Sequence, residues 1–161
     1  DCDFSHPPET MARLISHVFE GHDLAVASRY MKGGQYKSGL GWFGADESAF
    51  AVLLSRYMNI ALRWSLDPRF HDYTSGFIAA RRHVLEKIRL EGDYGEYFMD
   101  LMYRAILQGH TYKEVPFISP PRKSGVSKTG TTFRQLFQRG VKYLRTLFRL
   151  WGLRWSRRRE G

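Results

Sequence analysis

Apolar positions at helical spacing open the chain. Over residues 7–20 they stand three and four residues apart, at Met11, Leu14, Ile15, Val18 and Phe19. This spacing predicts a helix that buries one face. We expect Ser5 or His6 to cap this helix and Gly21 to end it.

A short strand is expected directly after this helix. Residues 23–28 alternate, with Leu24 and Val26 on one side. The strand would deliver Arg29 to its carboxyl end, which is where open α/β sheets bind their ligands. Arg29 is therefore a candidate site residue by position, although a strand-end arginine is often simply solvated.

The rest of the pattern continues this alternation of helices and strands. A second helix is expected from Asp46 to about residue 65, with an apolar stripe formed by Phe50, Leu53, Leu54, Tyr57, Ile60, Ala61 and Trp64. The pattern then predicts, in order, a short strand at 77–80, helices at 83–90 and 96–108, and a strand at 111–117. Such alternation indicates an α/β sandwich with a mostly parallel sheet.

A glycine-rich loop separates the first strand from the second helix. Residues 31–45 contain Gly33, Gly34, Gly39, Gly41 and Gly44. Two interpretations stay open, because long loops in compact domains tend to be either functional or disordered. The loop is a flexible surface linker or a mobile flap over a site.

The last part of the chain has the pattern of a basic amphipathic helix over residues 133–155. Its apolar residues repeat every three or four positions, at Phe133, Leu136, Phe137, Val141, Leu144, Leu147, Phe148, Trp151 and Trp155. Basic residues fill positions between them, at Arg134, Arg139, Lys142, Arg145 and Arg149. Such a helix is typical of a membrane interface. Packing on its own domain or on a partner helix is the alternative, and nucleic-acid binding is a weaker third possibility.

Charge supports the membrane interpretation of this tail. The 161 residues carry a formal net charge of +9, and residues 133–161 hold nine Arg or Lys and one Glu. The tail thus accounts for +8 and leaves +1 for the first 132 residues, which suggests that the tail meets anionic lipid. The chain has one cysteine, Cys2, so it forms no internal disulfide. The sequence contains no run of 18 apolar residues, so no transmembrane helix is predicted.

The first residues suggest a metal site. Asp1 and Asp3 would point to the same side of an extended segment. Two carboxylates at such a short separation suit Mg²⁺ or Mn²⁺, which complete their coordination with water and phosphate. An acidic turn before a helix is the simpler interpretation of these two residues on their own.

Five short motifs in sequence order resemble one enzyme family. They are Asp1-Cys2-Asp3-Phe4-Ser5-His6-Pro7-Pro8-Glu9, Ser28-Arg29-Tyr30 with Lys32-Gly33-Gly34, Asp72-x-Thr74-Ser75-Gly76-Phe77, Glu114-Val115-Pro116, and Arg122-x-x-Gly125-x-Ser127-Lys128. Together they resemble the polyprenol-phosphate glycosyltransferases of the dolichol-phosphate mannosyltransferase type, of family 2. The resemblance covers residues 1 to about 128.

The resemblance implies an incomplete GT-A glycosyltransferase fold. In this family a nucleotide-binding half precedes the Asp-x-Asp motif, and here the motif opens the chain. We therefore expect residues 1–130 to be the C-terminal portion of a catalytic domain that is inactive without the other half. Residues 131–161 would form the basic membrane-surface helix and tail.

The resemblance also implies a reaction and its site. A hexose, either mannose or glucose, would pass with inversion from a nucleoside-diphosphate sugar to a polyprenyl or dolichyl phosphate, with Mg²⁺ or Mn²⁺ as cofactor. Its metal ligands would be Asp1 and Asp3, and its catalytic residues Asp3, Arg29 and Arg122. The donor phosphates would contact Asp1, Arg29, Arg122, Ser127 and Lys128. The acceptor and sugar pocket would be shaped by Ser55, Asp72, Thr74, Ser75 and Gly76.

Some positions depart from the family pattern. Ala51 stands where many members have an arginine, Ser5 where some have Gln, and Asp100 where Glu is usual. These departures keep an alternative open, a non-catalytic membrane-surface module with degenerate motifs. A processive polysaccharide synthase is less consistent, since Ile60 replaces the glutamine that such enzymes place before Arg63-Trp64. For the enzyme we expect a peripheral position on the cytoplasmic side of a membrane and no nucleic-acid partner.

Overall fold

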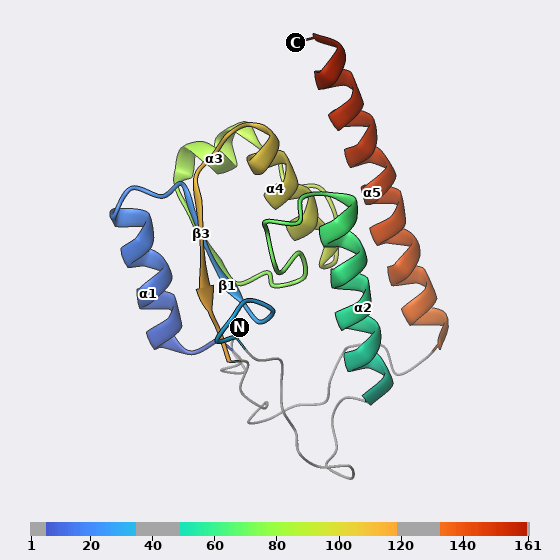
Figure 1. The fold of residues 1–161 in the computed structure, drawn as a ribbon, viewed down its shortest axis with the longest axis horizontal. Helices are drawn as coiled ribbons and strands as arrows, with labels where there is room; N and C mark the ends of the chain where they lie inside the picture. The colour runs from blue at the N-terminus through green and yellow to red at the C-terminus, as the bar shows by residue number, and fades with distance from the viewer. Residues whose placement is uncertain (1–5, 35–48, 119–132, 161) are drawn as a thin grey trace.

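The computed structural model describes residues 6–34, 49–118 and 133–160, and Figure 1 shows its elements in chain order. The elements are α1 (Pro8–Phe19), β1 (Leu24–Ser28), α2 (Ala49–Ser65), β2 (Ile78–Ala80), α3 (Arg82–Lys87), α4 (Glu96–Leu107), β3 (Tyr112–Pro116) and α5 (Phe133–Glu160). Every element predicted from the hydrophobic pattern is therefore present. Residue 46, the expected cap of α2, lies outside the described residues. The N-cap of α1 is Pro7 and makes no side-chain hydrogen bond, so His6 is not the cap.

The three strands form one small mixed sheet in the order β2-β1-β3. β1 runs parallel to β3 and antiparallel to β2, so the prediction of a mostly parallel sheet is wrong for β2. The connection from β1 to β2 is long and contains α2, so its length would have allowed either direction. The turn at residues 72–76 leads the chain back alongside β1, and β2 therefore runs against it.

Helices cover both faces of β1, and all five residues of this strand are buried. Leu24 and Val26 face the larger core, while Ala25 and Ala27 pack with Leu14 of α1. The predicted alternation of the strand is thus confirmed. Figure 1 shows α1 on one side of the sheet and α4, α2 and α5 on the other.

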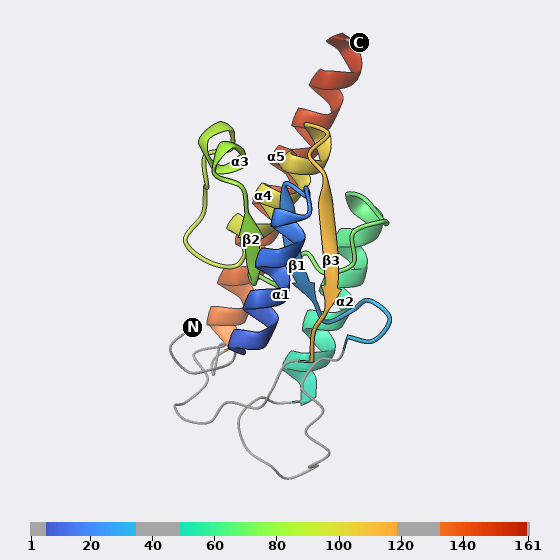
Figure 2. The ribbon, with the colours of Figure 1, turned by 90° about the vertical axis from the view of Figure 1, so that its left-hand side faces the viewer.

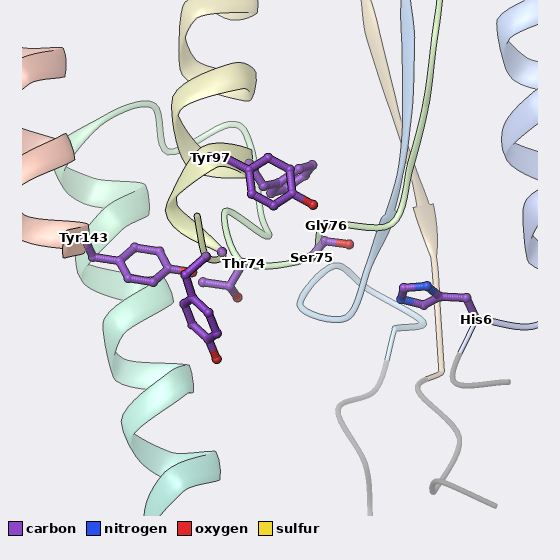
Figure 3. A pocket seen from close by; sticks show the side chains of 9 residues that line it. His6, Thr74, Ser75, Gly76, Tyr97 and Tyr143 are labelled. Atoms are coloured by element: carbon purple, nitrogen blue, oxygen red, sulfur yellow. The ribbon is translucent and has the colours of Figure 1, made fainter. Parts of the chain in front are cut away.

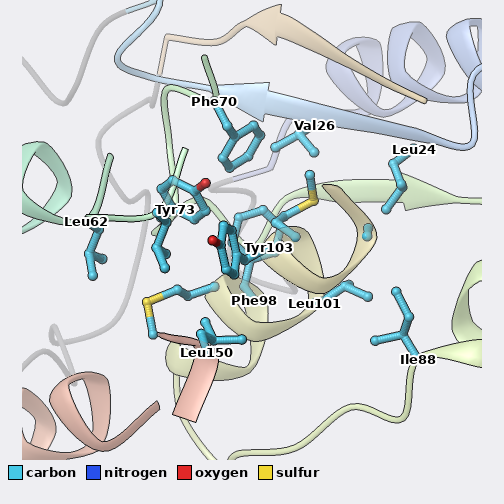
Figure 4. Close-up of a cluster of buried hydrophobic side chains, with 14 of the residues drawn as sticks. Leu24, Val26, Leu62, Phe70, Tyr73, Ile88, Phe98, Leu101, Tyr103 and Leu150 are labelled. Atoms are coloured by element: carbon cyan, nitrogen blue, oxygen red, sulfur yellow. The ribbon is translucent and has the colours of Figure 1, made fainter. Parts of the chain in front are cut away.

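The larger core lies between the sheet and helices α4 and α5 (Figure 4). The ring of Phe70 meets Tyr73 edge-on at a centroid distance of 4.8 Å. Phe98 of α4 and Leu150 of α5 are buried in the same cluster. Because α5 contributes to this core, it is packed on the domain along part of its length. The expected boundary near residue 130 lies outside the described residues.

The apolar face of α1 is only partly buried, which corrects the sequence prediction. Leu14 is buried and Val18 packs beside it, but Met11, Ile15 and Phe19 are exposed. The helix contacts the small sheet along a narrow line that also buries Thr10. Nothing among the described residues covers the other half of its apolar face.

α2 differs more strongly from its predicted orientation. Its stripe residues Leu53, Tyr57 and Trp64 are exposed, with Trp64 at 78%. The helix packs instead through Leu62 and Asn59, both buried. The polar Asn59 is satisfied there, because its amide nitrogen donates to the His71 carbonyl at 2.6 Å and its oxygen accepts from Tyr73 N at 2.9 Å. The hydrophobic pattern therefore marks an outward-facing stripe.

α5 has two distinct faces. Its inner face buries Tyr143, Leu147 and Leu150 against the domain. An outer stripe of exposed apolar residues runs along the same helix, at Phe137, Val141, Leu144, Phe148, Trp151 and Trp155. Figure 2 shows the C-terminal end of the helix extending beyond the rest of the described structure. Within the described residues, no helix is both long enough and apolar enough to cross a bilayer.

Basic residues of α5 tie its inner side to the domain. Lys142 Nζ lies 2.7 Å from Asp93 Oδ2, and Arg149 pairs with Glu91. The guanidinium of Arg139 lies over the Tyr94 ring, 4.3 Å from its centroid. Part of the positive charge that the sequence analysis assigned to a membrane surface therefore contacts protein.

Candidate functional site

The carboxyl end of β1 holds a buried ion pair. Arg29 follows the strand directly, and its Nε and Nη2 atoms donate to the Asp72 carboxylate at 2.8 and 2.9 Å. The Arg29 backbone N–H also donates to Asp72 Oδ2 at 3.0 Å. The side chain of Asp72 is fully buried and that of Arg29 is 15% exposed. A bidentate pair of this kind fixes the arginine in one orientation.

The segment after Asp72 forms a turn that is fastened to this pair. Thr74 donates from its backbone N–H and its hydroxyl to Asp72 Oδ1, at 3.1 and 3.0 Å. The Thr74 hydroxyl also accepts from Arg29 Nη2 at 2.8 Å. The Ser75 hydroxyl donates to the Ala27 carbonyl in β1. Gly76 has a φ of +69°, which favours glycine at the point where the chain turns back into β2.

These contacts bring together Arg29, Asp72, Thr74 and Ser75, four of the residues that the sequence analysis selected. The buried carboxylate accepts hydrogen bonds from both Arg29 and Thr74, as a buried polar group requires. Its charge also compensates the guanidinium, so Arg29 is held by protein and not simply solvated. The arrangement is a rigid polar turn at the ligand-binding end of the sheet.

Tyr30 connects this turn to α2. Its hydroxyl lies 3.5 Å from the Ser55 hydroxyl, and the Arg29 guanidinium lies 5.4 Å from the centroid of its ring. Burial raises the pKa of Tyr30 above its ordinary value, so the phenol is neutral at physiological pH. Ser55, expected in the acceptor pocket, thus lies beside Tyr30 next to the polar turn.

A pocket of about 310 Å³ opens beside the turn (Figure 3). Its lining combines polar groups of the turn with aromatic rings, and consists of His6, Thr74, Ser75, Gly76, Tyr94, Gly95, Tyr97, Phe98 and Tyr143. The His6 ring stacks on Phe77 with centroids 4.2 Å apart. The pocket therefore presents hydroxyl groups as well as aromatic rings to a bound molecule.

The aromatic wall of this pocket was not predicted from the sequence. Tyr94 and Tyr97 flank the start of α4, and Tyr143 reaches the pocket from α5. Tyr94 and Tyr97 stand on either side of Gly95-Glu96, at the start of a predicted helix, and this local pattern could have indicated a pocket wall. The position of Tyr143 had no such signal, because it depends on how α5 packs. Burial raises the pKa of Tyr143, which keeps this phenol protonated as well.

A second polar contact, partly buried, links the residue before this turn to β3. The His71 backbone N–H donates to Glu114 of β3 at 3.0 Å, and its Nδ1 atom lies 2.7 Å from Glu114 Oε2. Glu114 belongs to the Glu114-Val115-Pro116 motif. It therefore ties the residue before Asp72 to the neighbouring strand and positions the ion pair.

Several predicted site residues lie outside the described part of the chain. These are Asp1, Asp3, Arg122, Ser127 and Lys128. Asp100 is described, and it faces α5 rather than the pocket: its Oδ1 atom lies 3.0 Å from Arg149 Nη2.

Comparisons with known proteins agree on one family, although no family model matches the chain. A polyprenol monophosphomannose synthase from Mycolicibacterium smegmatis is 40% identical over 139 residues, which are 84% of the chain and 49% of that protein. A dolichol-phosphate mannosyltransferase from Pyrococcus furiosus is 32% identical over 161 residues, 97% of the chain and 40% of that protein. A dolichyl-phosphate hexose transferase from Haloferax volcanii is 29% identical over 116 residues, 72% of the chain and 46% of that protein.

The chain spans about half or less of the length of these curated relatives. The similarity nonetheless runs through the polar turn and both neighbouring helices, since it covers most of the chain. The chain therefore belongs to the polyprenol-phosphate mannosyltransferase-like family.

Proposed function

We propose that this chain forms part of a glycosyltransferase that moves a hexose, mannose in the first instance, from a nucleoside-diphosphate sugar to a polyprenyl phosphate. The observation that carries this proposal is the 40% identity to a polyprenol monophosphomannose synthase, along a chain whose polar turn and pocket lie at the carboxyl end of β1. The described elements would then belong to a GT-A fold. The similarity to named transferases also favours an enzyme over a non-catalytic module.

The chemistry of this reaction suits the site. The nucleophile is a phosphate oxygen that is already ionised at neutral pH, so the site needs no strong general base. It needs positive charge and hydrogen-bond donors that stabilise the departing diphosphate and the acceptor phosphate. Arg29 would bring a guanidinium that Asp72 holds in one orientation, and the Tyr97 hydroxyl lines the pocket beside the Thr74 hydroxyl that contacts Arg29. Direct attack from one face would invert the sugar carbon.

A divalent cation is part of the proposal. Asp1 and Asp3 would hold Mg²⁺ or Mn²⁺, because two carboxylates offer the hard oxygen ligands that these ions prefer. The ion would neutralise charge on the nucleoside diphosphate. Arg122, Ser127 and Lys128 would contact the same donor phosphates, and Ser55 would line the acceptor side.

A peripheral position on the cytoplasmic face of a membrane completes the proposal. Helices α2 and α5 lie on the side of the sheet opposite α1 (Figure 1), and their exposed apolar residues include Tyr57, Trp64, Trp151 and Trp155. Tryptophan and tyrosine favour the headgroup region of a bilayer. The phosphate of a polyprenol lies at this level, so a site held there meets its acceptor without extracting the lipid chain. The net charge of α5 favours anionic lipid.

The experiment follows labelled mannose from a nucleoside-diphosphate sugar into a polyprenyl phosphate, using the complete natural protein with Mg²⁺ or Mn²⁺. Tyr97→Phe removes a pocket hydroxyl with little change of shape and should lower turnover at least about tenfold. Thr74→Val should lower turnover as well, but it also removes contacts with Asp72 and Arg29, so its folding is measured by urea denaturation first. Ser16→Ala is the matched control, because Ser16 is exposed and bonds only to carbonyls of its own helix. A folded protein that labels no polyprenyl phosphate would contradict the proposed sugar transfer. Full activity in EDTA would contradict the proposed role of the metal ion.

A further inference from the structure

Three chain segments meet at the amino end of β1, at the opposite end of the strand from Arg29. Asp23 lies just before β1, His83 in the first turn of α3, and His110 between α4 and β3. His83 Nε2 is 3.1 Å from Asp23 Oδ1, and His110 Nδ1 is 3.5 Å from Asp23 Oδ2. One ligand atom from each residue lies within 4.8 Å of the other two. Figure 1 shows the starts of β1, α3 and β3 gathered at this end of the sheet.

The backbone and a hydroxyl hold the central carboxylate in place. Asp23 Oδ2 accepts from the Thr111 backbone N–H at 2.8 Å and from the Thr111 hydroxyl at 3.0 Å. The Asp23 carbonyl accepts from Arg81 N at 2.8 Å, which fixes the residues that precede α3. Oriented carboxylates of this kind are typical of metal sites, where outer hydrogen bonds aim the ligand atoms.

His110 contributes a buried ring with an unused nitrogen. Its side chain is 11% exposed, and Nε2 is buried with no hydrogen-bond partner in the described part of the chain. A buried polar atom without a partner is costly. Because Nδ1 is the ring nitrogen that faces Asp23, the lone pair of Nε2 is left for a metal ion or a hydrogen-bond donor. His83 is 46% exposed and leaves the cluster open to solvent on one side.

The two histidines approach the Asp23 carboxylate to distances that suit neighbouring ligands of one metal ion. Zinc binds histidine nitrogen and carboxylate oxygen at about 2.0–2.2 Å, which places neighbouring ligand atoms about 3.4 Å apart. His83 Nε2 is 3.1 Å from Oδ1 of Asp23 and His110 Nδ1 is 3.5 Å from Oδ2, and one ligand atom from each residue lies within 4.8 Å of the others. Two imidazoles and one carboxylate suit zinc and related transition metals, unlike the all-oxygen set preferred by Mg²⁺.

We propose that Asp23, His83 and His110 form a binding site for a divalent transition-metal ion, with zinc as the best match and water in the open fourth position. The ion would join segments that are distant in sequence and would stabilise the sheet from one end. Asp23 and Arg29 lie six residues apart across an extended strand, about 20 Å. The site is therefore separate from the proposed sugar-transfer centre and does not depend on that function.

The test measures zinc and cobalt binding to the full chain by calorimetry and by the visible absorption of bound Co²⁺. Asp1→Asn and Asp3→Asn are introduced first, so that the proposed Mg²⁺ or Mn²⁺ ligands do not contribute. We expect one equivalent of metal, the strong absorption of tetrahedral Co²⁺, and a higher unfolding temperature with zinc. Absence of this absorption, or binding of less than one equivalent, would overturn the proposal.

His83→Gln is the decisive variant, because His83 is half-exposed and its replacement leaves the core unchanged. It should weaken zinc binding at least about tenfold and remove the zinc-dependent rise in unfolding temperature. His17→Gln is the matched control, since His17 lies outside the cluster and pairs with Glu20 at 2.8 Å. Equal zinc affinity in His83→Gln and His17→Gln would show that Asp23 and the two histidines form only ion pairs. His110→Gln, checked for folding by circular dichroism, should repeat the loss.

Discussion

The Arg29 guanidinium and the Asp72 carboxylate make a two-point contact inside the protein, with nitrogen–oxygen distances of 2.8 and 2.9 Å. The Asp72 side chain has no exposure to solvent. Arg29 was selected from the sequence as a phosphate-binding residue, but the structure gives it a second role in holding the turn at residues 72–76. Loss of activity in an Arg29 variant therefore needs a stability measurement before it is assigned to a phosphate contact.

Arg29→Ala should destabilise the protein by about 3–5 kcal/mol, because it leaves the Asp72 charge buried without its partner. Denaturation with urea, followed by circular dichroism, measures this loss. Arg82→Ala is the matched control. Arg82 also pairs with a carboxylate, Glu86 at 2.7 Å, but both side chains are exposed, so its loss should cost less than about 1 kcal/mol. Similar small effects of both substitutions would contradict a structural role of the Arg29–Asp72 pair.

Gly34 allows the chain after β1 to pass close to its own backbone. A Cβ atom at Gly34 would lie 2.9 Å from the Arg29 carbonyl and closer still to the Ser28 oxygen. Gly34→Ala should therefore destabilise the protein by more than about 1 kcal/mol and disturb Arg29. Gly152→Ala is the opposite case, because a Cβ there meets nothing within 4 Å and alanine favours a helix by about 1 kcal/mol. Thermal unfolding should give a lower melting temperature for Gly34→Ala than for Gly152→Ala, and equal melting temperatures would contradict the close approach at Gly34.

Asp100 and Asp93 should change stability with pH in opposite directions. Burial raises the pKa of Asp100 above its ordinary 3.8, although Arg149 and Arg104 act against it. A raised pKa means that the folded state binds more protons, so this residue costs stability as pH rises from about 3.8 through the raised pKa. Asp100→Asn should thus gain stability relative to the natural protein over that range.

The Lys142 side chain lowers the pKa of Asp93 below 3.8. The contribution of the Asp93 carboxylate to stability is therefore present above pH 3.8 and is lost as pH falls through its lowered pKa. Asp93→Asn should lose stability relative to the natural protein as pH rises through that window. Urea denaturation at several pH values between about 2 and 7 gives both difference curves. Parallel curves would contradict the assigned pKa directions.

The sequence predicted which segments form helices and strands, but not which face of each helix is buried. Leu24 and Val26 of β1 were placed correctly, because a strand with covered faces leaves little choice. On α2 the apolar positions Tyr57 and Trp64 are exposed and the polar Asn59 is buried. Periodicity finds an apolar stripe, whereas packing partners decide whether that stripe points inward.

The candidate site was predictable to the extent that it lies in local motifs. Arg29 and the turn residues Asp72 and Thr74 were selected in advance, and they lie in hydrogen-bond contact. Tyr143 reaches the pocket from a helix far along the sequence, and His83 and His110 approach Asp23 from separate segments. Such contacts depend on tertiary packing, which spacing along one chain does not contain.

The inner face of α5 should determine the stability of the protein, and its outer face should determine membrane binding. Leu150 is fully buried and Phe148 is 62% exposed, although only one residue lies between them. Leu150→Ala should cost about 2–5 kcal/mol of stability, because it opens a cavity in the core. Phe148→Ala should leave stability within about 0.5 kcal/mol, since exposed positions contribute little to folding. Urea denaturation of both variants measures this contrast.

The same pair of variants, completed by Arg145→Gln, tests whether the outer stripe of α5 binds lipid. Phe148→Ala should weaken co-flotation with anionic vesicles by about tenfold, because it removes apolar surface that would enter the interface. Arg145→Gln removes an exposed charge, worth about 1 kcal/mol near anionic lipid, and should reduce binding to anionic vesicles without affecting neutral ones. Added salt should weaken binding of the natural protein for the same reason. If Phe148→Ala floats as well as the natural protein, or if lipid charge has no effect, the stripe binds protein rather than a membrane.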